Sequence, residues 1–153
     1  MGPYRRPRLR LEPLDDGQVL VADAEVCPTP DKPGARPRCR REVYLLPLVE
    51  QRFVQSDLLE DGEPAGPARI ATYEESAVPQ KDGWIRRSEV QRSLRFKATG
   101  ITIAESVRVR DCDPAAGANT CDEHELMRYE RELAWEDGRF STSRSAWGKA
   151  RTP

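Results

Sequence analysis

The sequence predicts an all-β domain, and three observations lead to this prediction. Two long stretches in the second half of the chain alternate apolar and polar side chains with the two-residue period of a half-buried strand. Two pairs of cysteines enclose loops that contain Pro and Gly. No segment longer than about ten residues shows the 3.6-residue apolar period of a packed helix. Because strands with one apolar face need a second layer, we expect an antiparallel β-sandwich or a partly open β-barrel of about eight to ten strands.

The first half of the chain is typical of short strands separated by loops. Residues 1–16 are rich in Arg and Pro and predict either an edge strand or a flexible N-terminal segment. The run at 18–26 is continuously apolar near its start, where we expect burial on both faces. Further strands are expected at 42–48, 52–54 and 68–73, with loops at 57–67 and 76–83.

The first long alternation, from Glu89 onward, predicts a β-hairpin. A two-residue turn at Thr99-Gly100 would place Val90 opposite Val109 on the apolar face. The same register puts Glu89 opposite Arg110 on the outer face, which is a favourable charge pair. A slip by one residue would turn the apolar side chains toward water, so the pattern fixes which face is buried.

The second hairpin has a stronger turn signal, because Asp137-Gly138 suits the left-handed conformations of a type I′ turn. Counting outward from this turn places Trp135 opposite Phe140. It also places Arg131 opposite Arg144 on a face that is otherwise apolar. Three interpretations follow: the strands splay there, two guanidinium groups share a carboxylate or a ligand, or both arginines reach past the sheet rim to water.

The four cysteines predict two local disulfides, Cys27 with Cys39 and Cys112 with Cys121, each clipping the mouth of a loop. A zinc site is the main alternative, but metal pairs usually have two to four residues between the cysteines, and these spacings are wider. Free thiols are the third alternative. Disulfides are typical of an oxidising compartment such as the bacterial periplasm or the cell exterior.

Length and composition bound the domain organisation. The 153 residues suffice for one domain with a core, which we place at 17–148, followed by a disordered tail at 149–153. Charged residues make up 33% of the chain, which strands with one solvated face would produce. The net charge of −1 gives no bulk electrostatic attraction to nucleic acid.

The N-terminus leaves two interpretations open. The chain begins Met-Gly-Pro-Tyr-Arg-Arg without the apolar segment of a secretory signal, and no run approaches the roughly 18 apolar residues of a transmembrane helix. A mature domain whose leader was replaced at Met1 would begin this way, and so would a native cytosolic protein. The cysteines favour the first, so we expect a periplasmic or extracellular location, which is compatible with a lipid anchor before Met1.

The sequence predicts no catalytic residue, cofactor or metal. His124 is the single histidine and lies among acids at a solvated corner, which excludes histidine pairs and histidine-based metal clusters. The Gly-x-Ser-x-Gly elbow and the nucleotide-binding glycine motifs are absent from the sequence. Acidic residues crowd the loop between Cys112 and Cys121, but their spacing matches no EF-hand calcium loop.

The segment around Trp84 is our candidate for contact with a partner. It places Trp84 beside Arg86 and Arg87 at the edge of an expected loop, and Trp and Arg are enriched at binding hot spots. The alternative is a Trp that packs inward beside two solvated arginines. We add Arg131 and Arg144 to the candidate binding residues, because their facing positions call for a shared partner.

We therefore expect a non-enzymatic bacterial cell-envelope protein, periplasmic or of lipoprotein type. It would bind another protein through its loops, as an inhibitor, immunity protein or assembly accessory does. A carbohydrate- or surface-binding module is the alternative, and it requires Trp84, Trp135 or Trp147 exposed on one concave face. A small hydrolase is the third hypothesis, and it requires a pocket that contains His124 and at least two convergent acids.

Overall fold

The computed structural model describes residues 7–15, 17–27, 29, 33–34, 39–116 and 120–147. Its strands are β1 (Arg8–Leu14), β2 (Gly17–Val26), β3 (Arg40–Val49), β4 (Arg52–Phe53), β5 (Asp57–Glu60), β6 (Glu63–Pro67), β7 (Arg69–Pro79), β8 (Ile85–Lys97), β9 (Gly100–Cys112), β10 (Cys121–Glu136) and β11 (Arg139–Thr142). Two short 3-10 turns, η1 (Lys81–Gly83) and η2 (Pro114–Ala116), accompany the strands, and no helix of the described residues is long and apolar enough to cross a membrane. The predicted all-β class is confirmed.

The eleven strands form one mixed sheet in the order β1-β2-β3-β7-β8-β9-β10-β11-β5-β6, with β4 paired to β3. Strands β11 and β5 are parallel, whereas we expected antiparallel pairing throughout. A hairpin forces its two strands to be antiparallel, but β5 and β11 lie far apart in the chain, so no turn fixes their relative direction.

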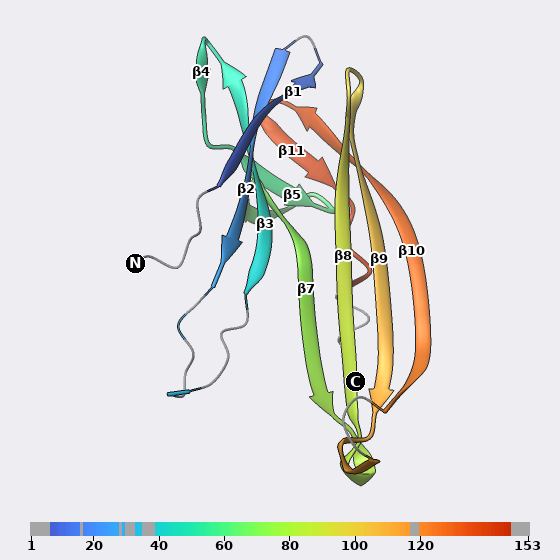
Figure 1. The fold of residues 1–153 in the computed structure, drawn as a ribbon. Helices are drawn as coiled ribbons and strands as arrows, with labels where there is room; N and C mark the ends of the chain where they lie inside the picture. The colour runs from blue at the N-terminus through green and yellow to red at the C-terminus, as the bar shows by residue number, and fades with distance from the viewer. Residues whose placement is uncertain are drawn as a thin grey trace.

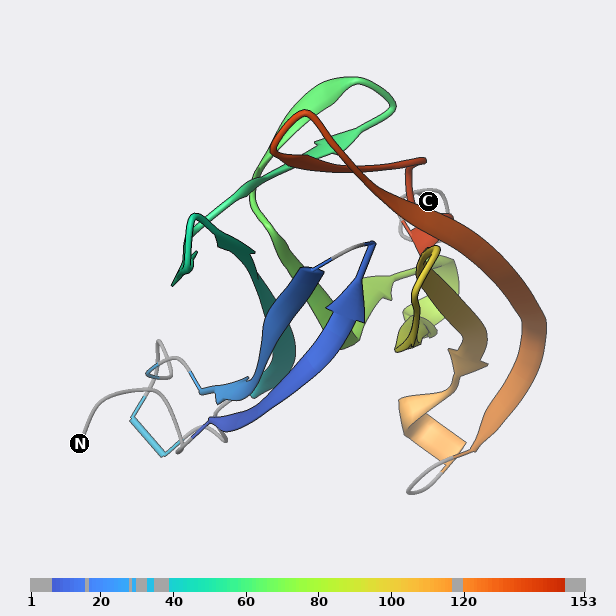
Figure 2. The same ribbon diagram turned by 90° about the horizontal axis from the view of Figure 1, so that it is seen from above.

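The sheet curls, but its two end strands, β1 and β6, are not paired with each other (Figures 1 and 2). Strand β6 continues into β7 through Ala68 alone, and the Ala68 amide donates to the carbonyl of Ser56 at 2.7 Å. The Ala68 carbonyl accepts from the amide of Leu45 at 2.9 Å, which brings this end of the sheet back to β3. On the other side, the guanidinium of Arg10 lies 5.6 Å from the ring centre of Phe96, so β1 approaches β8. This curl is that of a partly open barrel.

Two apolar clusters fill the inside of the curl. The larger one unites both halves of the sheet, and its fully buried members include Val19, Ile103 and Phe140. The ring of Phe140 lies 4.7 Å from that of Trp135, which is the cross-strand pair expected beside the Asp-Gly turn. The smaller cluster packs Trp147 against Val90, Val107, Val109 and Met127.

The registers of the two long hairpins differ in how well they were predicted. Trp135 pairs with Phe140 as expected, and Asp137 and Gly138 both have positive φ. In the other hairpin the turn lies at 98–99, so Val90 pairs with Val107 and Glu89 with Arg108, and the predicted Thr99-Gly100 turn is wrong. The shift is two residues, which leaves every side chain on its predicted face, and the apolar pattern cannot distinguish such registers.

Two segments predicted as loops are largely strands. Residues 57–67 form the β5–β6 hairpin, which turns at Asp61 and Gly62 with positive φ at both. Strand β7 extends to Pro79 instead of ending near residue 73. The prolines of β6 are tolerated because this strand ends the sheet and has one free edge. At the opposite end, β1 is an edge strand, and the predicted tail at 149–153 lies outside the described residues.

Both predicted disulfides are present, Cys27–Cys39 and Cys112–Cys121. Cys112 and Cys121 are also cross-strand partners at the ends of β9 and β10. The first bridge spans the loop between the ends of β2 and β3. Each bridge therefore closes a loop between two strands that are neighbours in the sheet.

We predict that replacing both cysteines of the second bridge, Cys112→Ala with Cys121→Ala, lowers the free energy of unfolding by about 2 to 3 kcal/mol, because the unfolded chain regains the entropy of an open loop. Urea unfolding monitored by tryptophan fluorescence would measure this loss. The pair Cys27→Ala with Cys39→Ala tests the first bridge in the same way and should show a loss of similar size. A second-bridge variant as stable as the parent chain would contradict the prediction.

Candidate functional site

A glutamate interrupts the apolar inner face of β9. Glu105 stands between Ile103 and Val107, which are both fully buried, and its own carboxylate has no solvent exposure. One carboxylate oxygen contacts Nε of Arg131 and lies 3.6 Å from Nε of Arg92. A buried carboxylate is costly unless opposite charges and hydrogen bonds surround it, so these contacts offset the cost of burying Glu105.

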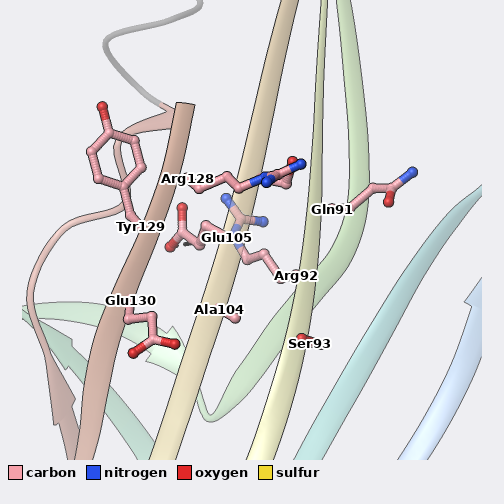
Figure 3. Close-up of a pocket in the computed structure, with 9 residues that line it drawn as sticks. Gln91, Arg92, Ser93, Ala104, Glu105, Arg128, Tyr129 and Glu130 are labelled. Atoms are coloured by element: carbon pink, nitrogen blue, oxygen red, sulfur yellow. Dashed lines mark ion pairs between the residues drawn. The ribbon is translucent and has the colours of Figure 1, made fainter. Parts of the chain in front are cut away.

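The neighbours of Glu105 extend this contact into a network. The Ser145 hydroxyl donates to the second oxygen of Glu105 at 2.6 Å and accepts from Arg92 at 2.9 Å. Arg92 also donates to Glu74 at 2.9 Å, and Arg131 donates to the carbonyl of Ser143 at 2.5 Å. Figure 3 shows the ion pair between Arg92 and Glu105. We call this set the buried ion cluster: Glu74, Arg92, Glu105, Arg131 and Ser145.

The buried ion cluster balances its own charge, with two arginines against two glutamates. Its cations are therefore engaged and are not free to hold an anionic substrate. The cluster fixes the segment after β11 to the inner face of β8, β9 and β10, and Trp147 follows two residues later. Its geometry supports a structural role.

Arg131 and Arg144 do not meet. Arg131 shares the carboxylate of Glu105 with Arg92, whereas Arg144 is exposed and lies 3.2 Å from Glu63 and 3.7 Å from Asp61. The shared carboxylate that the sequence suggested as one alternative thus exists, but with a different second arginine. Arg92 has the same parity as Val90 and Leu94, so strand alternation already directs it inward, and the register with β9 sets it opposite Glu105.

We predict that Glu105→Gln lowers the free energy of unfolding by about 3 to 5 kcal/mol, because it leaves the buried guanidinium of Arg131 without a compensating charge and leaves Arg92 with Glu74 alone. Chemical denaturation at pH 7 would measure this change. Glu130→Gln is the matched control, since Glu130 forms an exposed ion pair with Arg95 and should cost less than about 1 kcal/mol. Equal losses in the two variants would argue against the buried ion cluster.

The residues predicted around Trp84 lie at the end of the sheet that carries the second disulfide. Arg86 forms two hydrogen bonds with Asp111, at 2.9 and 3.1 Å. Arg87 is exposed and Trp84 is half-buried. His124 lies 3.8 Å from Asp111 and is largely solvated. These hydrogen bonds from Arg86 hold the pKa of Asp111 below its usual range, against the opposing effect of burial.

This pKa shift has a defined effect on stability. The carboxyl pKa is lower in the folded than in the unfolded chain, so the stabilisation is present above about pH 4 and is lost as pH falls through the folded pKa. We predict that Arg86→Met destabilises the protein at pH 7, and that the difference from the parent shrinks below about pH 4. Urea unfolding at several pH values would measure it. Arg87→Met, the neighbouring exposed arginine, should show no such dependence on pH.

A trough of about 450 Å³ lies across the middle of β8, β9 and β10 (Figure 3). By strand alternation, the side chains of Ser93, Ala104 and Ser106 share the face opposite Glu105. Short side chains here leave the trough between the longer Gln91 and Arg128. His124 does not line it, so the pocket required by the hydrolase hypothesis does not form here.

Among the described residues, one group of potential metal ligands comes close together: Glu25, Cys27 and Cys39. The two sulfurs are bonded to each other in the first disulfide. Metal binding by cysteine requires the thiolate, which a disulfide does not offer. This group therefore does not fit a metal centre while the bridge is intact.

The outer face of the β1–β2–β3 segment is apolar and solvated. Leu11 pairs with Leu20, and Leu20 with Leu46, so three leucines form one row across three neighbouring strands. Strand alternation puts further apolar residues on the same face, and Leu48 continues it to Phe53 of β4. We call this surface the outer leucine face: Leu9, Leu11, Leu20, Leu46, Leu48 and Phe53. Leu11 is 53% exposed and Phe53 is 41% exposed.

The apolar pattern of the sequence did not predict this surface. A run that is apolar on both parities was interpreted as buried on both faces near its start, but only one face of β2 packs into the core, through Val19 and Val21. Leu20 on the other face is half-buried, although no second layer of described residues covers it. The signal was present as adjacent apolar residues, Leu20 between two valines in β2 and Leu45-Leu46 in β3, but it does not say whether a second layer exists.

The predicted binding residues are not brought together. Trp84, Arg86 and Arg87 occupy one end of the sheet, Arg131 lies in the buried ion cluster, and Arg144 contacts the β5–β6 turn. Comparison with known proteins adds no assignment, because no family model, curated protein or solved structure matches this chain. Geometry and chemistry alone therefore carry the functional argument.

Proposed function

We propose that this chain is a non-enzymatic protein that binds another protein through the outer leucine face. The observation that carries the proposal is the row Leu11–Leu20–Leu46, which is apolar across three strands and open to solvent. Large exposed apolar patches are rare on isolated proteins and mark interaction sites. This proposal keeps the binding role expected from the sequence, but it moves the contact surface from the loops to a sheet face.

The chemistry of the face favours a protein over other partners. The residues that define it include no charged side chain, whereas anionic lipid or nucleic acid would call for Lys or Arg. The carbohydrate module considered from the sequence would require Trp84, Trp135 or Trp147 exposed on one concave face. Trp84 and Trp135 are half-buried, and Trp147 is 3% exposed and packed in the core. An apolar surface on another protein is the complement that remains.

We further propose that the binding takes place in the bacterial periplasm or at the cell exterior. Two disulfides support this location, because they persist in oxidising compartments. The biological class that fits is the one proposed from the sequence, an inhibitor, immunity protein or assembly accessory. The carbohydrate- or surface-binding module is the second candidate, and the experiment below separates the two.

The test is capture from an envelope extract by the immobilised, oxidised protein. We expect one protein to be retained in stoichiometric amount, and the double variant Leu11→Asp with Phe53→Asp to weaken its binding at least about tenfold, because the charges enter an apolar contact. Val49→Asp is the matched control, since Val49 is also exposed but has the opposite parity to Leu46 and Leu48 on β3. It should leave binding within about twofold.

The variants must be folded for this comparison, which far-ultraviolet circular dichroism and thermal unfolding would establish. Retention of the same protein by the parent and by the Leu11/Phe53 variant alike would contradict the proposed contact surface. Capture of glycan or lipid without protein would favour the surface-binding module instead.

A further inference from the structure

Strand β10 has a long unpaired edge. It pairs with β9 from Cys121 to Leu133, but with β11 only through its last three residues, 134–136. Within the described ranges, no strand pairs with the other side of residues 121–133, and no turn or loop backbone group bonds to it. Figures 1 and 2 show β10 as the outermost of the four long neighbouring strands, β7 to β10. Residues 122–130 are exposed apart from Met127, which is half-buried.

The edges at β1, β6 and β4 are short or contain proline. Edge strand β1 contains Pro13, the terminal strand β6 contains Pro64 and Pro67, and β4 has only two residues. Proline removes a backbone donor, and short or proline-containing edges are how proteins avoid unwanted strand pairing. The 16 residues of β10 include neither Pro nor Gly. Its pairing with β9 shifts register between Glu123 and Glu125, and from there to Leu133 the free edge presents an unbroken series of donors and acceptors.

The free backbone groups can be assigned from the hairpins. In a two-residue hairpin the closing residues exchange hydrogen bonds, and alternate residues then bond to opposite neighbours. Glu136 closes the β10–β11 turn with Arg139, so even-numbered residues of β10 point their backbone groups away from β9. The β8–β9 turn gives the same assignment. Lys97 and Gly100 close this turn, so even-numbered residues of β9 bond to β8 and odd-numbered ones bond to odd-numbered residues of β10. The free groups thus belong to Leu126, Arg128, Glu130 and Glu132.

We propose that this edge pairs with the same edge of a second copy of the chain, antiparallel about a two-fold axis at Tyr129. Charge selects that register. An axis at Arg128 or at Glu130 would set that residue against its own copy, and like charges directly opposite are destabilising. An axis at Tyr129 places Arg128 opposite Glu130 of the other copy, twice. Arg128 has no ion pair among the described residues, so this register supplies its counter-charge.

Tyr129 fits the centre of such an interface. It is 41% exposed, and in Figure 3 its ring projects from β10 on the side away from β9. At a two-fold axis the two rings would lie side by side and cover each other. The backbone N–H and C=O groups of Arg128 and Glu130 would donate to and accept from the other copy. These hydrogen bonds would continue the sheet from one copy into the next. The outer leucine face lies at the other end of the strand order and stays free in this dimer.

Sedimentation velocity over a wide range of concentrations tests the dimer. We expect the oxidised parent protein to dimerise, Arg128→Glu to weaken dimerisation at least about tenfold, and Arg128→Glu with Glu130→Arg to restore it, because the swap re-forms the pair between copies. Both positions are on an exposed strand face, and circular dichroism would confirm that the variants fold. A parent protein that stays monomeric at every concentration would overturn the proposal, and so would a dimer that Arg128→Glu leaves unchanged.

Cysteine crosslinking tests the register independently. Tyr129→Cys would set two thiols opposite each other at a non-hydrogen-bonded pair, where the Cα atoms lie about 4.5 Å apart, within disulfide reach. Mild oxidation should therefore give a covalent dimer on a non-reducing gel. Leu126→Cys is the matched control, equally exposed on the same strand but about 20 Å from its own copy in this register. Equal crosslinking of both variants would overturn the register. A co-purified foreign strand bound at this edge would overturn the pairing between copies.

The dimer and the proposed binding function can fail separately. Loss of dimerisation in Arg128→Glu with full retention of the captured protein would support the edge assignment while leaving the outer leucine face as the partner site. Loss of capture by the Leu11/Phe53 variant, with dimerisation unchanged, would show that the partner site can be lost without any effect on pairing at the β10 edge. A leucine-face variant that also became monomeric would place the contact between copies on that face and overturn the edge proposal.

Discussion

The charge of Glu105 is the constraint on which much of this fold depends. A carboxylate at the centre of an apolar strand face needs cations and hydrogen-bond donors around it, and no single strand can supply them. Arg92 comes from β8, Arg131 from β10, and Ser145 from the segment after β11. Satisfying one side chain therefore fixes three strands and the C-terminal segment relative to one another.

The same constraint restricts alternative registers. A slip of one residue between β9 and a neighbouring strand would remove an arginine from Glu105 and place it on the opposite face of the sheet. A slip of two would keep the face, but it would set Glu105 against a different side chain, such as Val90 or Leu94 in place of Arg92. Apolar patterning permits a two-residue slip, whereas the buried ion cluster does not.

Because the inner charges compensate one another, the surfaces with unmet interactions lie on the outside of the sheet. The outer leucine face has apolar side chains without a covering layer, and the edge of β10 has backbone groups without a partner strand. Both features are consequences of an open sheet, in which outer faces and terminal strands have nothing beyond them. A closed barrel would have removed the edge, and a two-layer sandwich would have covered the face.

The sequence by itself determined the class of the fold, both disulfides, the Trp135–Phe140 register and the buried face of the strands in the two long hairpins, because alternation and turn chemistry are local properties. Tertiary structure decided the two-residue shift in the first hairpin, the parallel β5–β11 pair, the partner of Arg131 and the exposure of Leu20. Each of these depends on which distant strand lies beside or above a residue. A local pattern can state that a side chain is apolar or charged, but only the assembled sheet supplies the neighbour that buries or neutralises it.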